Sequence, residues 1–143
     1  MILQNISDLG YLPQRIISLV PSQTELLYDL GLENETAGIT KFCIHPSTWY
    51  KTKERVGGTK TIQLDKIHQL QPDLIIANKE ENVKDQIKLL ALDYPIWLTD
   101  VHNLEEALQM IEDIGSLTGK NEQALSLTSQ IKAGFDCLTK IEK

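Results

Sequence analysis

Two short apolar runs rich in β-branched residues, RIISLV at 15–20 and DLIIAN at 73–78, constrain the fold of this chain most strongly. A run of this length between turn residues predicts a buried strand, and each run precedes a stretch with apolar residues at helical spacing. Weaker runs at 36–42 and 95–99 repeat the pattern. Alternation of strands and helices at this spacing predicts parallel pairing through right-handed crossovers. We therefore expect an α/β fold, a doubly wound parallel sheet of about four strands flanked by helices.

The expected helices have their own start and stop signals. Ser22 and Glu25 form an S-x-x-E capping box before an apolar face that Gly31 ends. Further helical stretches are expected at 47–53, 64–70, 82–91 and 104–114, the last interrupted or ended between Gly115 and Gly119. A final apolar stripe predicts one long helix over 121–143, and its members are Leu127, Ile131, Phe135, Leu138 and Ile141.

Charge and hydropathy exclude two classes of partner. The net charge is −6, whereas nucleic-acid binding depends on clustered Lys and Arg, so we expect no nucleic acid. No window holds 18 consecutive apolar residues, so we expect no membrane span. The first ten residues have neither a basic nor an apolar signal region, so we expect no secretory leader in this chain. A cytoplasmic location therefore stays open, as does prior removal of a leader.

The segment KFCIHP at 41–46 follows the second expected strand, and ligand crevices of such sheets lie outside the carboxyl ends of strands. Cys43 and His45 could supply two metal ligands, but a structural zinc site requires four. A catalytic Cys–His pair would need an orienting third group, which the spacing does not supply. We therefore expect no catalytic residue and no metal held directly by the protein, and we assign the segment, His45 included, to a pocket lip.

Other strand exits carry groups suited to a polar ligand. The helix start at Ser22 offers free backbone donors, and the glycine pair in VGGT (56–59) brings backbone close to a neighbour. Lys41, Lys60 and Lys79 could gather on one rim of an otherwise acidic surface. That rim would suit an anionic or carboxamide-rich ligand.

The stretches RIISLVPSQTELLYDLG and VGGTKTIQLDKIHQLQPDLIIAN resemble substrate-binding proteins of metal-chelate ABC transporters, the vitamin B12 and ferric-siderophore group with a helical backbone. The resemblance runs from about Asp8 to Gly119. It implies a binding protein, not an enzyme, that holds a chelate between two α/β lobes joined by a long helix. Residues 1–119 would be the N-terminal lobe and 120–143 the start of the interlobe helix, with the second lobe absent from this chain.

The resemblance also implies two kinds of site, a ligand-binding site and a docking site. Asp65 would be the docking residue, which binds an arginine of the membrane permease. The residues that would face the ligand, together with the lip histidine and the rim lysine, are Pro21, Ser22, Gln23, Phe42, Cys43, His45, Gly58, Thr59, Asn78 and Lys79. Cobalamin binders often have aromatic rings near the positions of Thr59 and Asn78, and this chain has none there.

The implied ligand is a corrinoid such as cobalamin, or a ferric siderophore, bound without a covalent cofactor. The implied partners are ABC permease subunits, and the implied location is periplasmic or cell-surface. The alternative is a cytoplasmic corrinoid or metal-chelate sensor or carrier that works without a permease.

Overall fold

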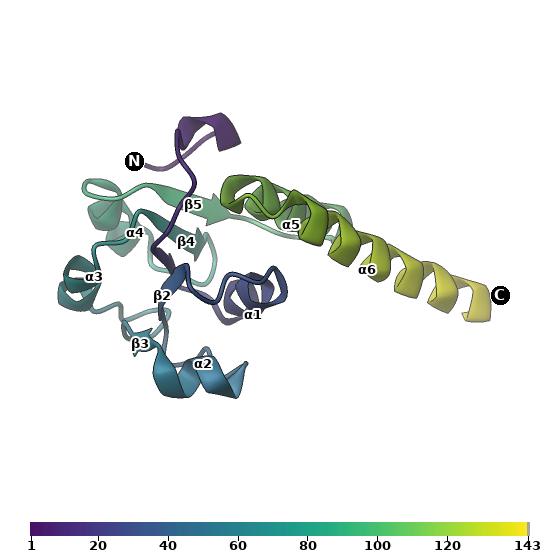
Figure 1. Cartoon of the computed structure of the whole chain (residues 1–143), viewed down its shortest axis with the longest axis horizontal. Helices are drawn as coiled ribbons and strands as arrows, with labels where there is room; N and C mark the ends of the chain where they lie inside the picture. The colour runs from purple at the N-terminus through teal and green to yellow at the C-terminus, as the bar shows by residue number, and fades with distance from the viewer. Residues whose placement is uncertain (143) are drawn as a thin grey trace. The chain divides into compact units, whose positions relative to one another are not determined.

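The computed structural model describes residues 1–142, with side chains described as far as Cys137 (Figure 1). The elements in chain order are η1 (Ile6–Asp8), β1 (Ile16–Ser18), α1 (Pro21–Asp29), β2 (Thr36–Ile39), α2 (Ser47–Thr52), β3 (Glu54–Arg55), α3 (Leu64–Leu70), β4 (Leu74–Asn78), α4 (Lys84–Ala91), β5 (Ile96–Thr99), α5 (Leu104–Thr118) and α6 (Asn121–Glu142).

The strands form one parallel sheet in the order β3-β2-β1-β4-β5. The predicted α/β class and parallel pairing are confirmed. The structure adds β3, a fifth strand that the sequence did not reveal. Glu54 and Arg55 are both exposed and polar, so this two-residue strand has no apolar signature. The free edge of β5 is covered by the N-terminal segment, since Ile96 exchanges backbone hydrogen bonds with Met1 and Leu3 at 2.9 Å each.

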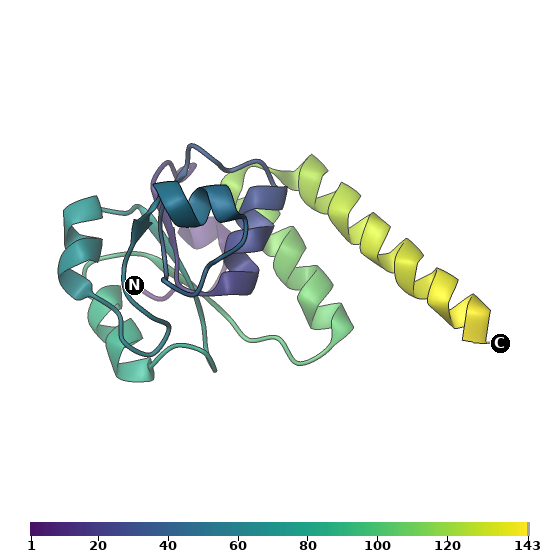
Figure 2. The ribbon, with the colours of Figure 1, turned by 90° about the horizontal axis from the view of Figure 1, so that it is seen from below.

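Helices cover both faces of the sheet, as a doubly wound fold requires. Helix α1 lies on one face, and α3 and α4 lie on the other (Figures 1 and 2). The main apolar core fills the α3/α4 face, where Ile17 and Ile75 from the sheet pack with Ile67 and Ile87 from the two helices. All four side chains are at most 3% exposed. Burial on both faces therefore explains why the strands are continuous apolar runs and do not alternate with polar residues.

The predicted capping box at Ser22 and Glu25 is wrong. Helix α1 begins two residues earlier than that box implies, with Val20 as the N-cap and Pro21 at the first helical position, and no side chain caps it. Proline is favoured there because its fixed φ suits a helix and its missing N–H would have no partner in any case. Ser22 therefore lies inside the first turn and is exposed.

The described chain divides into two compact units, one spanning Met1–Asp100 and one beginning at Val101. The second unit contains α5 and α6. Gly115 does not interrupt α5, which ends at Gly119 in the left-handed conformation (φ 72°). A side chain at Gly115 would collide with Ala124, so glycine permits the close approach of α5 and α6. The side chains of Leu138 and Ile141, predicted to extend the stripe of α6, lie outside the described residues.

Among the residues described, no helix is both long and apolar enough to cross a membrane.

Candidate functional site

The strand order places a topological switch point between β1 and β4. Strand β1 leads through α1 to β2 on one side, whereas β4 leads through α4 to β5 on the other. Ligands of such sheets bind in the crevice outside the carboxyl ends of the strands at this point. The segments that follow β1, β2, β4 and β5 therefore form the candidate site.

One part of the site is an exposed lip built from Lys41, Phe42 and Gly58. Phe42 is 54% exposed although it is a large apolar residue. Its ring lies against Gly58, where an added Cβ would approach the ring within 3.1 Å. The Lys41 ammonium lies 5.2 Å from the centre of the same ring. The lip thus presents an aromatic surface beside a positive charge, with Gly58 leaving room for the ring.

The structure separates the two residues of the predicted Cys–His lip. Cys43 is fully buried, and its Sγ lies 3.0 Å from Thr24 Oγ1 and 3.1 Å from Thr40 Oγ1. His45 is exposed. The two side chains do not point the same way, because the chain turns after Thr40 instead of staying extended. Cys43 has no accessible surface to offer a ligand in this arrangement. Its Sγ instead accepts a hydrogen bond from Thr24 of α1, which connects the lip to that helix.

Behind the lip lies a set of polar side chains, the buried amide cluster, made of Gln23, Asn78, Asn82 and Thr99. Gln23 is 1% exposed, and its Nε2 donates to Thr99 Oγ1 and, at 3.4 Å, to the Ala77 carbonyl. Asn78 Nδ2 donates to Thr99 Oγ1 at 3.2 Å. Gln23 Oε1 is buried and has no hydrogen-bond partner among the described residues. An unpaired buried carbonyl is costly, so this atom is a natural acceptor for a donor small enough to reach it, such as a water molecule.

Asn82 connects three segments of the site. Its Nδ2 donates to the carbonyls of Leu19 and Thr59 at 3.2 and 3.1 Å, and its Oδ1 accepts from the Asn78 backbone N–H at 2.9 Å. The loops after β1, before α3 and after β4 are thereby held together. The sequence analysis assigned no role to Asn82 or Thr99. The available signal was their position, since each is a polar residue at or just after the end of an apolar strand.

The three predicted rim lysines all lie in loops around this edge. Lys60 Nζ donates to the Glu80 carbonyl at 2.7 Å, which joins the loop after Thr59 to the loop after β4. Lys79 pairs with Asp100 at 3.8 Å, and both side chains are substantially exposed. Such exposed pairs are weak, so Lys79 remains available to a ligand.

The remaining predicted residues lie at the same edge with different exposure. Pro21 and Thr59 are partly exposed and Ser22 is exposed, whereas Gly58 is buried beneath Phe42. Asp65 lies elsewhere, in the first turn of α3, where it is exposed beside a shallow depression formed by residues 62–66.

Comparison with known proteins agrees with this architecture. The family model described as periplasmic binding protein matches residues 16–141. The vitamin B12-binding protein of Vibrio campbellii is 32% identical over 126 residues, covering 87% of this chain and 46% of that protein. An uncharacterised ABC transporter substrate-binding lipoprotein of Bacillus subtilis is also 32% identical, over 85% of this chain and 39% of its own length.

Solved structures show the same likeness. The periplasmic vitamin B12 binding protein of Vibrio cholerae superposes with a TM-score of 0.78 at 29% identity, covering 88% of this chain and 49% of that one. A siderophore binding protein bound to acinetobactin and ferric iron superposes with a TM-score of 0.79 at 20% identity, covering 87% of this chain and 47% of that one. At this identity the likeness shows a common fold. The chain spans about half the length of the relatives it matches.

These matches confirm the predicted resemblance to substrate-binding proteins of ABC transporters. They also confirm the prediction that the chain is not an enzyme, because the family is made up of binding proteins. By the match over most of its length, this chain belongs to the periplasmic binding protein family.

Proposed function

We propose that this chain is the first lobe of a solute-binding component of an ABC importer, and that it captures a metal chelate at the carboxyl edge of its sheet. The ligand is a corrinoid such as cobalamin, or a ferric siderophore. The observation that carries the proposal is the exposed Phe42 ring, which lies over Gly58 and beside Lys41 at the switch point. Exposed aromatic surface beside polar groups is typical of binding sites.

The chemistry of this edge suits such a chelate. A corrinoid or siderophore offers a broad, partly apolar surface with carboxamide, hydroxyl or anionic groups around it. Phe42 can pack against the apolar part, and Lys41 and Lys79 can receive the anionic or carbonyl groups. Gln23 Oε1, which is buried and unpaired among the described residues, can accept a hydrogen bond from an amide or a water molecule.

We further propose that residues 1–119 form the N-terminal lobe and that α6 begins the helix leading to a second lobe. The relatives that match are about twice as long as this chain, which leaves room for that lobe. Two large apolar side chains of α6, Leu125 and Phe135, are 55% and 49% exposed and could pack against it. Capture would then occur between two lobes, with the helix keeping lobe closure small.

Docking to the permease is assigned to Asp65. The carboxylate is exposed, and among the described residues it makes no ion pair, whereas its neighbour Lys66 pairs with Glu54 at 3.7 Å. An arginine of the permease could therefore form a charge-assisted hydrogen bond with it. The named relatives are periplasmic proteins or lipoproteins, which supports a location outside the cytoplasmic membrane.

Titration of the 143-residue chain with cobalamin, a ferric hydroxamate and a ferric catecholate tests the assignment. We expect one of the three to shift backbone amide resonances of the loops after β1, β2 and β4. Phe42→Ala should weaken that binding about tenfold, because a packed aromatic ring contributes through both its area and its geometry.

Leu89→Ala is the matched control. Leu89 is 53% exposed, almost the same as Phe42, but lies on α4 outside the candidate site. Its replacement should leave chelate binding unchanged. If no chelate shifted these loops, or if Leu89→Ala weakened binding as much as Phe42→Ala, the proposed site would be refuted.

A further inference from the structure

A second hollow lies between α4 and the edge strand β5, in the unit spanning residues 1–100. Its volume is about 240 Å³. The apolar part of its wall comes from Ile2, Ile87 and Leu98, which belong to the N-terminal segment, α4 and β5. It shares only Asn78, Lys79 and Asn82 with the strand exits described above, and its lining continues along α4 and does not include Lys41, Phe42 or Gly58.

The size of the hollow sets the size of its occupant. An engineered apolar cavity of about 150 Å³ accepts benzene. At roughly 30 Å³ for each water-sized group, 240 Å³ corresponds to about eight non-hydrogen atoms. The hollow therefore matches a short alkyl chain or a substituted ring, and is too small for a corrinoid or a siderophore.

Three lysines at the rim determine the charge of that occupant. Lys79, Lys84 and Lys88 all line the hollow and are exposed. Lys84 and Lys88 are one helical turn apart, so their like charges oppose each other. Lys84 also lies at the first position of α4, where the helix dipole disfavours a cation. Within the described part of the chain neither makes an ion pair, whereas Lys79 pairs with Asp100. An anion between Lys84 and Lys88 would offset both the repulsion between the two lysines and the unfavourable interaction of Lys84 with the helix dipole.

We propose that this hollow binds a small organic anion of the medium-chain carboxylate class, with an apolar chain of about seven carbon atoms inside the hollow and the carboxylate at its rim. The chain would pack against Ile2, Ile87 and Leu98, and the carboxylate would lie between Lys84 and Lys88. The site shares Asn78 and Lys79 with the proposed chelate site, whereas Lys84, Lys88 and the apolar wall belong to it alone, so the proposal does not depend on chelate binding.

Titration with octanoate, butanoate and octanol tests the proposal, with amide chemical shifts of the 143-residue chain as the readout. Octanoate should bind saturably and shift Ile2, Ile87 and Leu98. Each fully buried methylene contributes about fourfold in affinity and butanoate has four fewer than octanoate, so butanoate should bind at least about tenfold more weakly even if only half of them are buried. Octanol should also bind more weakly than octanoate, because it lacks the charge that faces the lysines.

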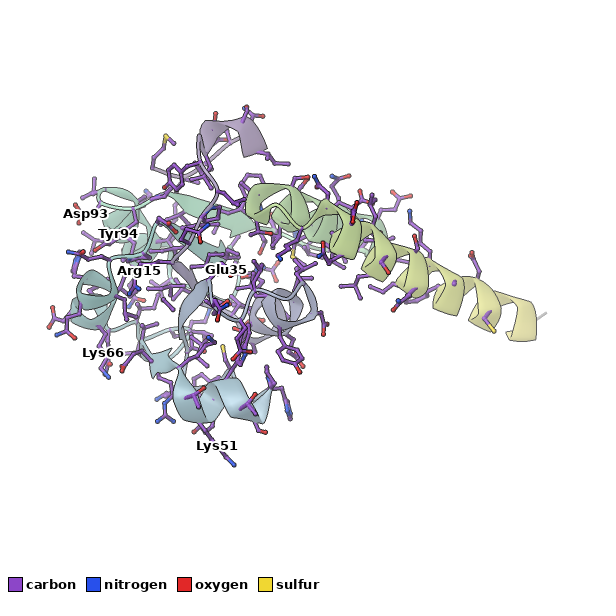
Figure 3. All side chains as sticks on the ribbon, in the orientation of Figure 1. Arg15, Glu35, Lys51, Lys66, Asp93 and Tyr94 are labelled. Carbon is purple, nitrogen blue, oxygen red and sulfur yellow. The ribbon has the colours of Figure 1, made fainter. Side chains whose placement is uncertain are left out.

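The double variant Lys84→Gln/Lys88→Gln should weaken octanoate binding by about tenfold or more. Lys51→Gln/Lys66→Gln is the control with the same change in net charge, and Figure 3 shows both of these lysines on the surface of α2 and α3. It should bind octanoate as the parent chain does. Leu98→Phe, a conservative change at a partly exposed position, should fill the hollow and block octanoate while circular dichroism shows an unchanged fold.

Three results would overturn the proposal. The first is a failure of octanoate to bind saturably, or shifts that map to the loop of Phe42 instead of α4 and β5. The second is equal weakening by the control variant, which would show a general effect of charge. The third is equal binding of butanoate and octanoate, which would show that the apolar wall contributes nothing.

Discussion

Replacement of Asn82 by aspartate should destabilise the chain through the loops of the candidate site. Asn82 is 4% exposed and donates two hydrogen bonds, to the carbonyls of Leu19 and Thr59 at 3.2 and 3.1 Å. Aspartate keeps the size of the side chain and the Oδ1 acceptor for the Asn78 N–H. It replaces the donor by an oxygen that faces two carbonyl oxygens. The change therefore removes the two donated bonds and adds a buried carboxyl group in their place.

The magnitude follows from those bonds. Each contributes about 1 kcal/mol net, and a buried carbonyl left without a donor costs about 1–3 kcal/mol. Asn82→Asp should therefore lower the free energy of unfolding by about 3–5 kcal/mol at pH 7. Asn82→Ala should cost less, about 2–4 kcal/mol, because it buries no charge, although it also loses the bond that Oδ1 accepts from the Asn78 N–H. Both losses are smaller than, or comparable to, the stability of a typical domain.

The pH dependence distinguishes this mechanism from a simple packing defect. Burial beside two carbonyl oxygens should raise the pKa of the carboxyl introduced by Asn82→Asp above its unfolded value of about 3.9. A raised folded-state pKa means that the protonated form is favoured by folding. The destabilisation of Asn82→Asp, relative to the parent chain at the same pH, should thus be smallest below about pH 4 and grow as the pH rises through the folded-state pKa. Asn82→Ala should show no such dependence.

Urea unfolding followed by circular dichroism at several pH values measures these differences, with the slope m checked for a constant change in exposed surface. Asn34→Ala is the control, because Asn34 is exposed and should change stability by less than about 0.5 kcal/mol. A loss below about 1 kcal/mol for Asn82→Asp at pH 7, or a loss that does not vary with pH, would refute the role of Asn82 in joining the loops.

Three further predictions follow from the proposed two-lobe binding protein. Asp65→Ala in the full-length protein should abolish uptake while chelate affinity and melting temperature barely move; unchanged uptake, or a stability loss of several kcal/mol, would contradict docking. The 143-residue chain should bind its chelate weakly in calorimetry, because one lobe supplies half of the contacts, and submicromolar affinity would argue against a two-lobe site. Amide hydrogens of α6 should exchange faster than those of β1, because an isolated helix is marginally stable; equal protection in a monomer would show that α6 needs no further lobe.

The fold was largely predictable because burial controls it. The segments that form β1 and β4 are continuous runs of apolar, β-branched residues, so the sequence itself indicates that they are buried on both faces of the sheet. The helical segments between the strands indicate parallel pairing. Strand β3 was not readable, because two exposed polar residues form it only through the neighbouring β2. The start of α1 was misassigned because two start signals overlap there, and Pro21 prevails over the side chain of Ser22.

The candidate site was predictable in position but not in its internal contacts. The strand exits follow from the fold, so Phe42, Gly58 and Asn78 could be placed at one edge. The partners of Asn82 lie 63 and 23 residues away in the chain, and no local pattern encodes such pairs. Cys43 likewise contacts the hydroxyl of Thr24, which is 19 residues away in the chain. Contacts of this kind arise only when the chain has folded.

The pairing of the N-terminal segment with β5 matters for handling the protein. An uncovered outer strand offers a row of free N–H and C=O groups onto which another chain can add, a common route to aggregation. Here the outward-facing N–H and C=O of Ile96 are hydrogen-bonded to the backbone of Met1 and Leu3. Removal of the first three residues would take away this cover, so the shortened chain should aggregate more readily than the parent chain.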